Sequence, residues 1–219
     1  MIILNQLYKR YTVNGRSTVV ADNIDLELPG KTSIALLGAN GAGKSSLLRM
    51  IGGTMKPTRG SIDTNGTVSW PVGFAGNFHP DLSGSQNTRF IARVYGVDSD
   101  ELIDYVTGFS GLGYHMDLPL RTYSSGMRSR LAFGVSMGID FDTYLVDEVT
   151  SVGDQNFREK SSAVFKRRVE SRAAIVVSHS NHTLRELCTA GMILKNGKLT
   201  YFDDLDTAIH LHNQNMRNI

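Results

Sequence analysis

The apolar positions of the chain follow two patterns, and each predicts a different kind of strand. Residues 18–28 alternate apolar and polar side chains, which predicts half-buried antiparallel strands with one solvated face. Residues 33–37 form a continuous apolar run instead, as do residues 143–146 and 173–177. Such runs are typical of strands covered on both faces, and a loop and a helical pattern follow each of them. The repeated unit predicts an α/β fold with a parallel sheet.

The middle of the chain, about residues 80–140, has helical periodicity instead. Apolar side chains recur about every 3.6 residues in segments 85–95, 99–108 and 126–138. We therefore expect an α-helical subdomain that is inserted between two halves of the sheet. Both parts would belong to a single domain that spans residues 1–219.

The composition is that of an ordinary globular domain. Hydrophobic residues make up 41% of the 219 residues and charged residues 20%, which suffices for a substantial core. The 23 basic residues nearly balance the 21 acidic ones, and they are dispersed apart from residues 166–168. This balance argues against a nucleic-acid partner, and the basic run is expected to be a solvated helix face. Residues 210–219 are polar enough to fray.

The cysteine content and the chain start bear on location. Cys188 is the single cysteine, so no intramolecular disulfide can form, which indicates a reducing compartment. It is expected to be a buried, small apolar group. Residues 1–6 turn polar too soon for a signal peptide, and nowhere do about 18 apolar residues run together. The sequence therefore predicts a cytoplasmic protein that does not itself span a membrane.

A glycine-rich loop follows the first buried strand. Residues 38–45 match the P-loop pattern G-x-x-x-x-G-K-[S/T] between a predicted strand and a predicted helix. Glycines let successive backbone N–H groups point at phosphate oxygens, and the helix start near Lys44 adds partial positive charge. We expect Lys44 to reach the β- and γ-phosphates of ATP and Ser45 to ligate Mg²⁺. The nucleotide-binding residues predicted in this segment are Gly38, Ala39, Asn40, Gly41, Ala42, Gly43, Lys44, Ser45 and Ser46.

A second apolar strand, residues 144–148, ends in two acidic residues. The first carboxylate, on Asp147, is predicted to lie beside the P-loop and hold Mg²⁺ with its waters. The second, on Glu148, is the candidate general base that polarises an attacking water. Without a P-loop upstream, a strand that ends in Asp-Glu is as often a plain strand end.

Residues 123–127, Tyr-Ser-Ser-Gly-Met, resemble the LSGGQ signature motif of ABC ATPases. A Ser hydroxyl and exposed N–H groups at a helix start can hold a phosphate. The resemblance implies a P-loop NTPase with a RecA-like core, an antiparallel β subdomain and an inserted α-helical subdomain. In this family the motif contacts the nucleotide of the opposing subunit. It therefore implies a homodimer in which Ser124, Ser125 and Gly126 contact that nucleotide.

Other positions match the family in order. Asp154 resembles the D-loop residue that crosses to the partner, and His179 resembles the switch histidine that orients the attacking water. The implied catalytic residues are therefore Lys44, Glu148 and His179. Tyr11 resembles the aromatic residue that stacks on adenine, although the residue alone could equally belong to the core or the surface.

Two departures from the family pattern concern hydrogen bonding. Met127 replaces the usual glutamine of the signature, and Ser125 replaces its first glycine, so the glutamine's hydrogen bonds are lost. The family's Q-loop normally supplies a glutamine to Mg²⁺ and couples to the membrane partner. Residues 69–80 contain no clear equivalent, and His79 is the candidate to take over part of that position.

These departures resemble one branch of the family, the exporters of capsular polysaccharide, with O-antigen and teichoic-acid exporters as relatives. O-antigen exporters often carry an extra C-terminal domain, for which 219 residues leave no room. The resemblance implies an ATPase that uses ATP and Mg²⁺ to drive export of a lipid-linked glycan through a separate permease, present in two copies. It also implies a peripheral position on the cytoplasmic face of the bacterial inner membrane, within a larger envelope-spanning complex.

Three alternatives remain open. A soluble ABC protein that acts on DNA or ribosomes would normally carry tandem cassettes, zinc modules or long coiled-coil insertions. A regulatory module could retain the fold without turnover, against which Glu148 and His179 speak. The third alternative keeps the motor and changes the cargo to O-antigen or teichoic acid.

Overall fold

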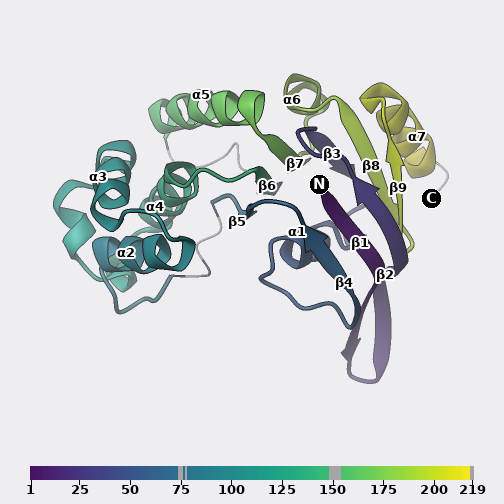
Figure 1. The fold of residues 1–219 in the computed structure, drawn as a ribbon, viewed down its shortest axis with the longest axis horizontal. Helices are drawn as coiled ribbons and strands as arrows, with labels where there is room; N and C mark the ends of the chain where they lie inside the picture. Colours follow the sequence, from purple (N-terminus) through teal and green to yellow (C-terminus); the bar gives the residue numbers. More distant parts are fainter. Residues whose placement is uncertain (74–75, 77, 148–153, 218–219) are drawn as a thin grey trace. The chain divides into compact units, whose positions relative to one another are not determined.

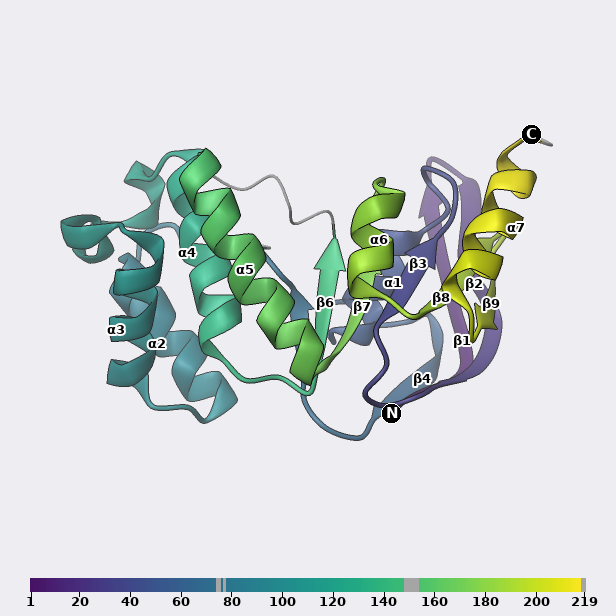
Figure 2. The same cartoon turned by 90° about the horizontal axis from the view of Figure 1, so that it is seen from above.

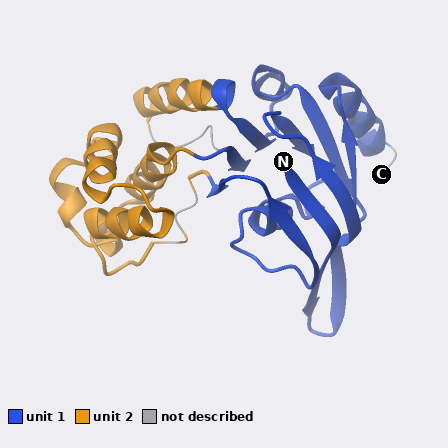
Figure 3. Ribbon diagram, viewed as in Figure 1, with its two compact units in different colours: residues 1–71, 141–148, 169–219 blue, residues 72–140, 149–168 orange. Residues whose placement is uncertain are grey.

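The computed structural model describes residues 1–73, 76, 78–147 and 154–217. The chain divides into two compact units (Figure 3). The core unit comprises residues 1–71, 141–148 and 169–219, and the helical unit comprises residues 72–140 and 149–168. In sequence, the helical unit therefore combines the predicted helical segment with most of a further helix.

The core unit contains two sheets (Figure 1). The antiparallel sheet has the order β2-β1-β4. The second sheet has the order β5-β6-β7-β3-β8-β9, and all its neighbours are parallel except the β8-β9 hairpin. The strands are β1 (Ile2–Val13), β2 (Arg16–Leu28), β3 (Ile34–Leu37), β4 (Arg59–Thr64), β5 (Val68–Pro71), β6 (Thr143–Asp147), β7 (Ala173–Val177), β8 (Ala190–Lys195) and β9 (Lys198–Phe202). The predicted α/β class is confirmed.

Burial explains why the two sheets have different sequence patterns. Every residue of β3 and β7 is buried, because both strands are interior to the second sheet. Strand β2 alternates over part of its length, since one of its faces packs on the core and the other is solvated. The core unit also contains α1 (Lys44–Ile51), α6 (Asn181–Leu187) and α7 (Leu205–Arg217). Side chains from α1 and from strands of both sheets share one hydrophobic cluster, so α1 is anchored in the core.

The helical unit contains the three predicted helices with nearly the expected bounds. They are α2 (Gly84–Tyr95), α3 (Ser99–Ser110) and α4 (Ser125–Gly138), and they lie side by side (Figure 2). Two 3₁₀ turns, η2 (Gly113–Asp117) and η3 (Leu120–Thr122), precede α4, and most of α5 (Gln155–Ser171) completes the unit. Phe109 of α3 stacks on Phe133 of α4 and meets Phe157 of α5 edge-on. These aromatic contacts join three helices into one core.

The expectation that residues 210–219 fray is wrong for the part that the structure describes. Helix α7 continues to Arg217, and Asn215 accepts a hydrogen bond from Lys195 Nζ at 2.6 Å. His212 is partly buried, and this burial, together with the charge of Lys44, lowers its pKa. Tertiary contacts therefore hold a polar helix end that the sequence pattern alone leaves unsupported.

The expectation for Cys188 is confirmed, and the expected solvated face at residues 166–168 is confirmed for two of its three residues. Cys188 is buried, with 6% of its surface exposed, and burial raises the pKa of its thiol to about 12. In the basic run, Lys166 and Arg167 are exposed, whereas Arg168 is partly buried and pairs with Asp140 at 3.2 Å. No helix among the described residues is both long enough and apolar enough to cross a membrane.

A carboxylate joins three strand starts of the second sheet. Asp142 accepts hydrogen bonds from the Thr67 backbone N–H at 2.8 Å and the Thr67 hydroxyl at 3.0 Å, and Arg172 lies 3.5 Å away. The Thr67 hydrogen bonds, helped by Arg172, lower the pKa of Asp142. The ionised carboxylate therefore stabilises the folded state.

We expect Asp142→Asn to lower the unfolding temperature at pH 7 by a few degrees, corresponding to about 1 kcal/mol for hydrogen bonds to an exposed carboxylate. Because the pKa is lowered in the folded state, this stabilisation is complete above about pH 4 and is lost as the pH falls through the folded-state value. Thermal unfolding at pH 7 and pH 3 checks this, with the exposed Asp104→Asn as control. An equal difference at both pH values would contradict it.

Candidate functional site

The start of α1 is shaped for binding an anion. Gly43 is the N-cap residue with φ of 104°, and a Cβ there would lie 2.7 Å from the Val20 Cβ, so a side chain has no room. The first N–H groups of a helix have no intrahelical acceptor and carry partial positive charge. Leu47 and Leu48 are at most 1% exposed, which fixes this helix end in the core.

Lys44 lies folded over the loop that precedes it. Its ammonium group donates hydrogen bonds to the carbonyl oxygens of Gly38 at 2.7 Å and Ala39 at 3.1 Å. These two carbonyls place the positive charge within the P-loop. A local rearrangement of the Lys44 side chain would therefore suffice for its ammonium group to pair with a bound phosphate.

A cavity of about 600 Å³ opens at the N-terminal end of α1, within the core unit. Asp147 ends β6 and is paired in register with Val177 at the end of β7, while His179 follows that strand. Open parallel sheets bind ligands at these carboxyl ends of their strands. The cavity is lined by Tyr11, Val20, Asn40, Gly41, Gly43, Lys44, Ser45, Ser46, Asp147, Val177 and His179.

Tyr11 is half-buried at the edge of this cavity. Its hydroxyl lies 3.0 Å from the Ser46 Oγ and 3.0 Å from the Met55 Sδ. These contacts tie β1 to the first turn of α1 and hold the ring against the cavity.

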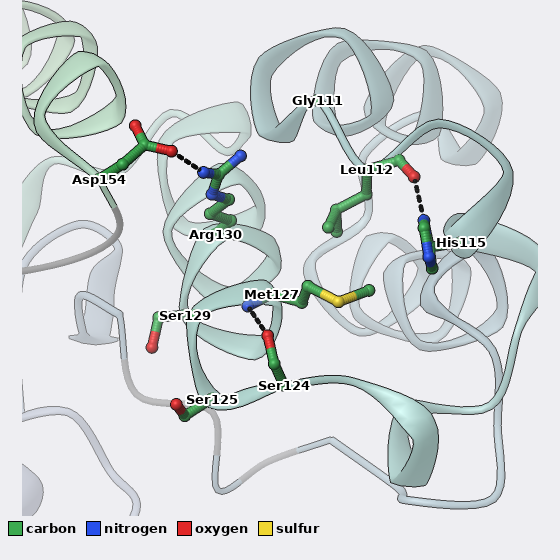
Figure 4. Close-up of a pocket in the computed structure, with 10 residues that line it drawn as sticks. Gly111, Leu112, His115, Ser124, Ser125, Met127, Ser129, Arg130 and Asp154 are labelled. Carbon is green, nitrogen blue, oxygen red and sulfur yellow. Dashed lines mark hydrogen bonds and ion pairs between the residues drawn. The ribbon is translucent and has the colours of Figure 1, made fainter.

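A second cavity, of about 590 Å³, lies within the helical unit at the start of α4 (Figure 4). Ser124 is the N-cap of α4, and its Oγ accepts a hydrogen bond from the Met127 N–H at 3.2 Å. The Ser124 hydroxyl hydrogen therefore stays available to a ligand. Ser124 and Ser125 are both exposed, and Gly126 also lines the cavity.

Asp154 and Arg130 form an ion pair on the wall of the second cavity (Figure 4). Asp154 also accepts a hydrogen bond from the Phe157 N–H at 2.9 Å, and this bond, followed by the charge of Arg130, lowers the pKa of Asp154. The guanidinium of Arg130 also lies over the Phe157 ring, 5.1 Å from its centroid. The carboxylate is thus held ionised beside the start of α4.

Comparison with known families matches residues 21–151 to the family described as ABC transporter. The chain is 46% identical over 213 residues to the polysialic acid transport ATP-binding protein KpsT of Escherichia coli, with 95% of each chain covered. It is 41% identical to the capsule polysaccharide export ATP-binding protein CtrD of Neisseria meningitidis, with 97% of this chain and 99% of CtrD covered. The chain belongs to the ABC ATPase family.

A solved structure supports the fold of this ABC ATPase. The dimeric post-hydrolysis structure of the ATP-binding cassette MJ0796, bound to ADP and Pi, matches with a TM-score of 0.74. It is 20% identical and covers 94% of this chain and 99% of its own. The predicted P-loop NTPase fold of ABC ATPase type is therefore confirmed.

The structure brings most of the predicted site residues of this ABC ATPase to one of the two cavities. Gly38, Ala39 and Ala42 line a neighbouring cavity of about 490 Å³ under α7, and not the cavity at the N-terminal end of α1. Glu148, the predicted general base, lies outside the described residues. The roles of all these residues stay predictions.

The second cavity is also lined by five residues that the sequence analysis did not indicate: Gly111, Leu112, His115, Ser129 and Arg130. Arg130 could have been found, because it lies one helical turn after Met127 on α4. His115 could not, since it belongs to a 3₁₀ turn without any periodic signal.

His79 is held in a turn that leaves it a hydrogen-bond donor. Its Nδ1 accepts the Asp81 N–H at 3.2 Å, so in the neutral ring the proton lies on Nε2. Mg²⁺ prefers oxygen ligands. This geometry favours donation to a phosphate or a water over ligation of Mg²⁺.

The side chain of Asn87, which is 3% exposed, organises the His79 segment. Its Oδ1 accepts the His79 N–H at 2.8 Å. Its amide nitrogen donates to three carbonyl oxygens between 3.0 and 3.2 Å away, those of His79, Leu82 and Ser83. One buried side chain thus satisfies four backbone groups.

We expect Asn87→Asp to destabilise the protein by at least about 2 kcal/mol, because a buried carboxylate would face three carbonyl oxygens without a donor. Chemical denaturation measures this, with the exposed α7 variant Asn213→Asp as the control. An unchanged midpoint for Asn87→Asp would show that the amide network does not hold the segment.

Proposed function

We propose that this ABC ATPase binds and hydrolyses ATP to drive export of a lipid-linked capsular polysaccharide across the bacterial inner membrane. The observation that carries the proposal is the cavity that joins Lys44, Ser45, Asp147 and His179. This cavity occurs in a chain whose relatives of nearly equal length are named for polysialic acid transport and capsule polysaccharide export. The chain would work at the cytoplasmic face of the membrane with a separate permease, present in two copies, within an envelope-spanning complex.

The first cavity offers the groups that a nucleotide with Mg²⁺ needs. Lys44 and the N–H groups at the start of α1 would bind the phosphates, and the Tyr11 ring would stack on adenine. Ser45 and Asp147 present oxygen atoms, which fit the preference of Mg²⁺. Bound Mg²⁺ would neutralise charge on the phosphates during hydrolysis.

The second cavity would take part through a second copy of the chain. Ser124, Ser125 and Gly126 would contact the γ-phosphate held by the partner's P-loop, while Asp154 lies on the same wall. ATP would then favour the closed homodimer over separate subunits, because only the closed state offers both sets of contacts. Closure would move the permease.

Hydrolysis would reset this cycle. Glu148 would accept a proton from the attacking water, and His179 would orient that water against the γ-phosphate. Release of the γ-phosphate removes the group that joins the two subunits, so the dimer would open.

We expect Lys44→Ala to weaken ATP binding about tenfold to a hundredfold, since a hydrogen bond to a charged group is lost. Equilibrium binding of a fluorescent ATP analogue measures this. Lys198→Ala is the control, because its ammonium bonds the Asp22 carbonyl at 2.7 Å, away from the cavity. Equal affinity of Lys44→Ala and the parent protein would remove Lys44 from the site.

We expect Glu148→Gln to bind ATP normally but to hydrolyse it about 10²–10⁴ times more slowly, because the general base is lost. Its ATP-bound dimer should persist in light scattering, while the parent protein returns to monomers as ATP is consumed. Full phosphate release by this variant would exclude Glu148 as the base.

Copurification from membranes tests the cargo. The tagged chain should retain a permease, and mass spectrometry should identify a capsular glycan on a lipid carrier. An O-antigen or teichoic-acid precursor would keep the motor and change the cargo, whereas recovery with ribosomes or DNA would favour a soluble ABC class.

A further inference from the structure

Two short segments of the helical unit, residues 79–83 and 119–123, are joined although they are far apart in the sequence. Ser83 and Pro119 form an isolated antiparallel bridge. Two N–H groups of the later segment donate to two carbonyls of the earlier one: Leu120 to Leu82 at 3.0 Å and Arg121 to Pro80 at 2.8 Å. We call this connection the 80–121 tie.

An ion pair lies on the 80–121 tie. The Arg121 guanidinium is 2.5 Å from the Asp81 carboxylate, and the two side chains are 63% and 58% exposed. An exposed pair of this kind adds little to global stability. Changing its charges therefore alters the tie without threatening the fold.

Hydrogen bonds join the earlier segment to His79. The Asn87 amide bonds the backbone of His79, Leu82 and Ser83, and the Asp81 N–H bonds the His79 ring. These hydrogen bonds therefore connect His79 to the other residues of segment 79–83.

The later segment leads directly into Ser124. Tyr123 is 2% exposed, its N–H donates to the Leu120 carbonyl at 3.0 Å, and its hydroxyl donates to the His115 carbonyl at 2.5 Å. Ser124 follows as the N-cap of α4. The position of Ser124 is thus fixed by the segment that the tie holds.

A close approach at the start of α2 reinforces the tie. A Cβ on Gly84 would lie 2.5 Å from the Tyr123 hydroxyl oxygen and 3.3 Å from the Met116 Cα. Gly84 directly follows residues 79–83, so even a methyl group there would displace Tyr123 or Met116.

We propose that Asp81 and Arg121 are positioning residues, which hold Ser124 in register with the His79 segment. A displacement of His79 by a phosphate, a water or a permease then moves Ser124 toward or away from the nucleotide of the opposing subunit. This inference rests on the proposed function, because it assigns Ser124 to the nucleotide bound by a second copy.

The test measures ATP-driven dimerisation in the Glu148→Gln background by light scattering. Asp81→Arg and Arg121→Asp should each raise the ATP concentration for half-maximal dimerisation about threefold to tenfold, and the double exchange should return it to within about twofold of the parent. The single-variant effects should shrink in high salt, because exposed charges are screened. ATP affinity at protein concentrations too low for dimerisation should not change.

A matched ion pair and a matched glycine provide controls. Arg89 and Asp100 pair at 2.9 Å in the same unit, and exchanging their charges should leave dimerisation unchanged. Gly84→Ala should impair dimerisation in the same direction as the tie variants. Gly108→Ala should not, since a Cβ on this glycine of α3 meets no atom within 4 Å.

The outcomes separate the two proposals. Single exchanges that leave dimerisation unchanged, or that are not rescued by the double exchange, would overturn the positioning role while the proposed function stands. A loss of unfolding temperature without any shift in ATP dependence would show a purely structural tie and would overturn it as well. Failure of the Glu148→Gln parent to dimerise on ATP would overturn both proposals.

Discussion

Helix α1 depends on four apolar side chains, Leu47, Leu48, Met50 and Ile51, that are at most 4% exposed. Burial of each such side chain contributes about 1.5–3 kcal/mol, so the helix cannot shift without losing a large part of the core energy. The groups of the core unit that are proposed to bind phosphate are all positioned by this helix: the loop before it, the N–H groups at its start and the strand ends beside it. The core is therefore the precondition for a cavity that can bind a strongly charged ligand.

In the helical unit, by contrast, the start of a helix lies at the surface. The stacked rings of Phe109 and Phe133 bury the body of α4, while Ser124 and Ser125 at its beginning stay exposed. Lys160 of α5 donates to the carbonyls of Gly108 and Phe109, at 3.3 and 2.9 Å, and so satisfies the exposed end of α3. The packing thus supports the start of α4, the proposed γ-phosphate contact, without covering it.

The sequence predicted those parts whose information is contiguous. The P-loop, the strand that ends in Asp147 and the signature serines could be recognised because each lies in one short segment next to one element. The four-bond role of Asn87 and the pairing of Arg121 with Asp81 could not, since the sequence pattern reports the spacing of apolar side chains and not which group a polar side chain meets. The prediction that the polar end of α7 frays failed for the same reason, because Lys195, which donates a hydrogen bond to Asn215, belongs to β8.

The burial of Cys188 has a practical consequence for spectroscopy. A thiol that is 6% exposed, with its pKa raised to about 12, has almost no thiolate at neutral pH and reacts slowly with maleimides. Since it is the single cysteine, the unaltered chain already serves as a silent background for site-directed labelling. Spin or fluorescent probes on newly introduced surface cysteines would report subunit movements without first removing the native one.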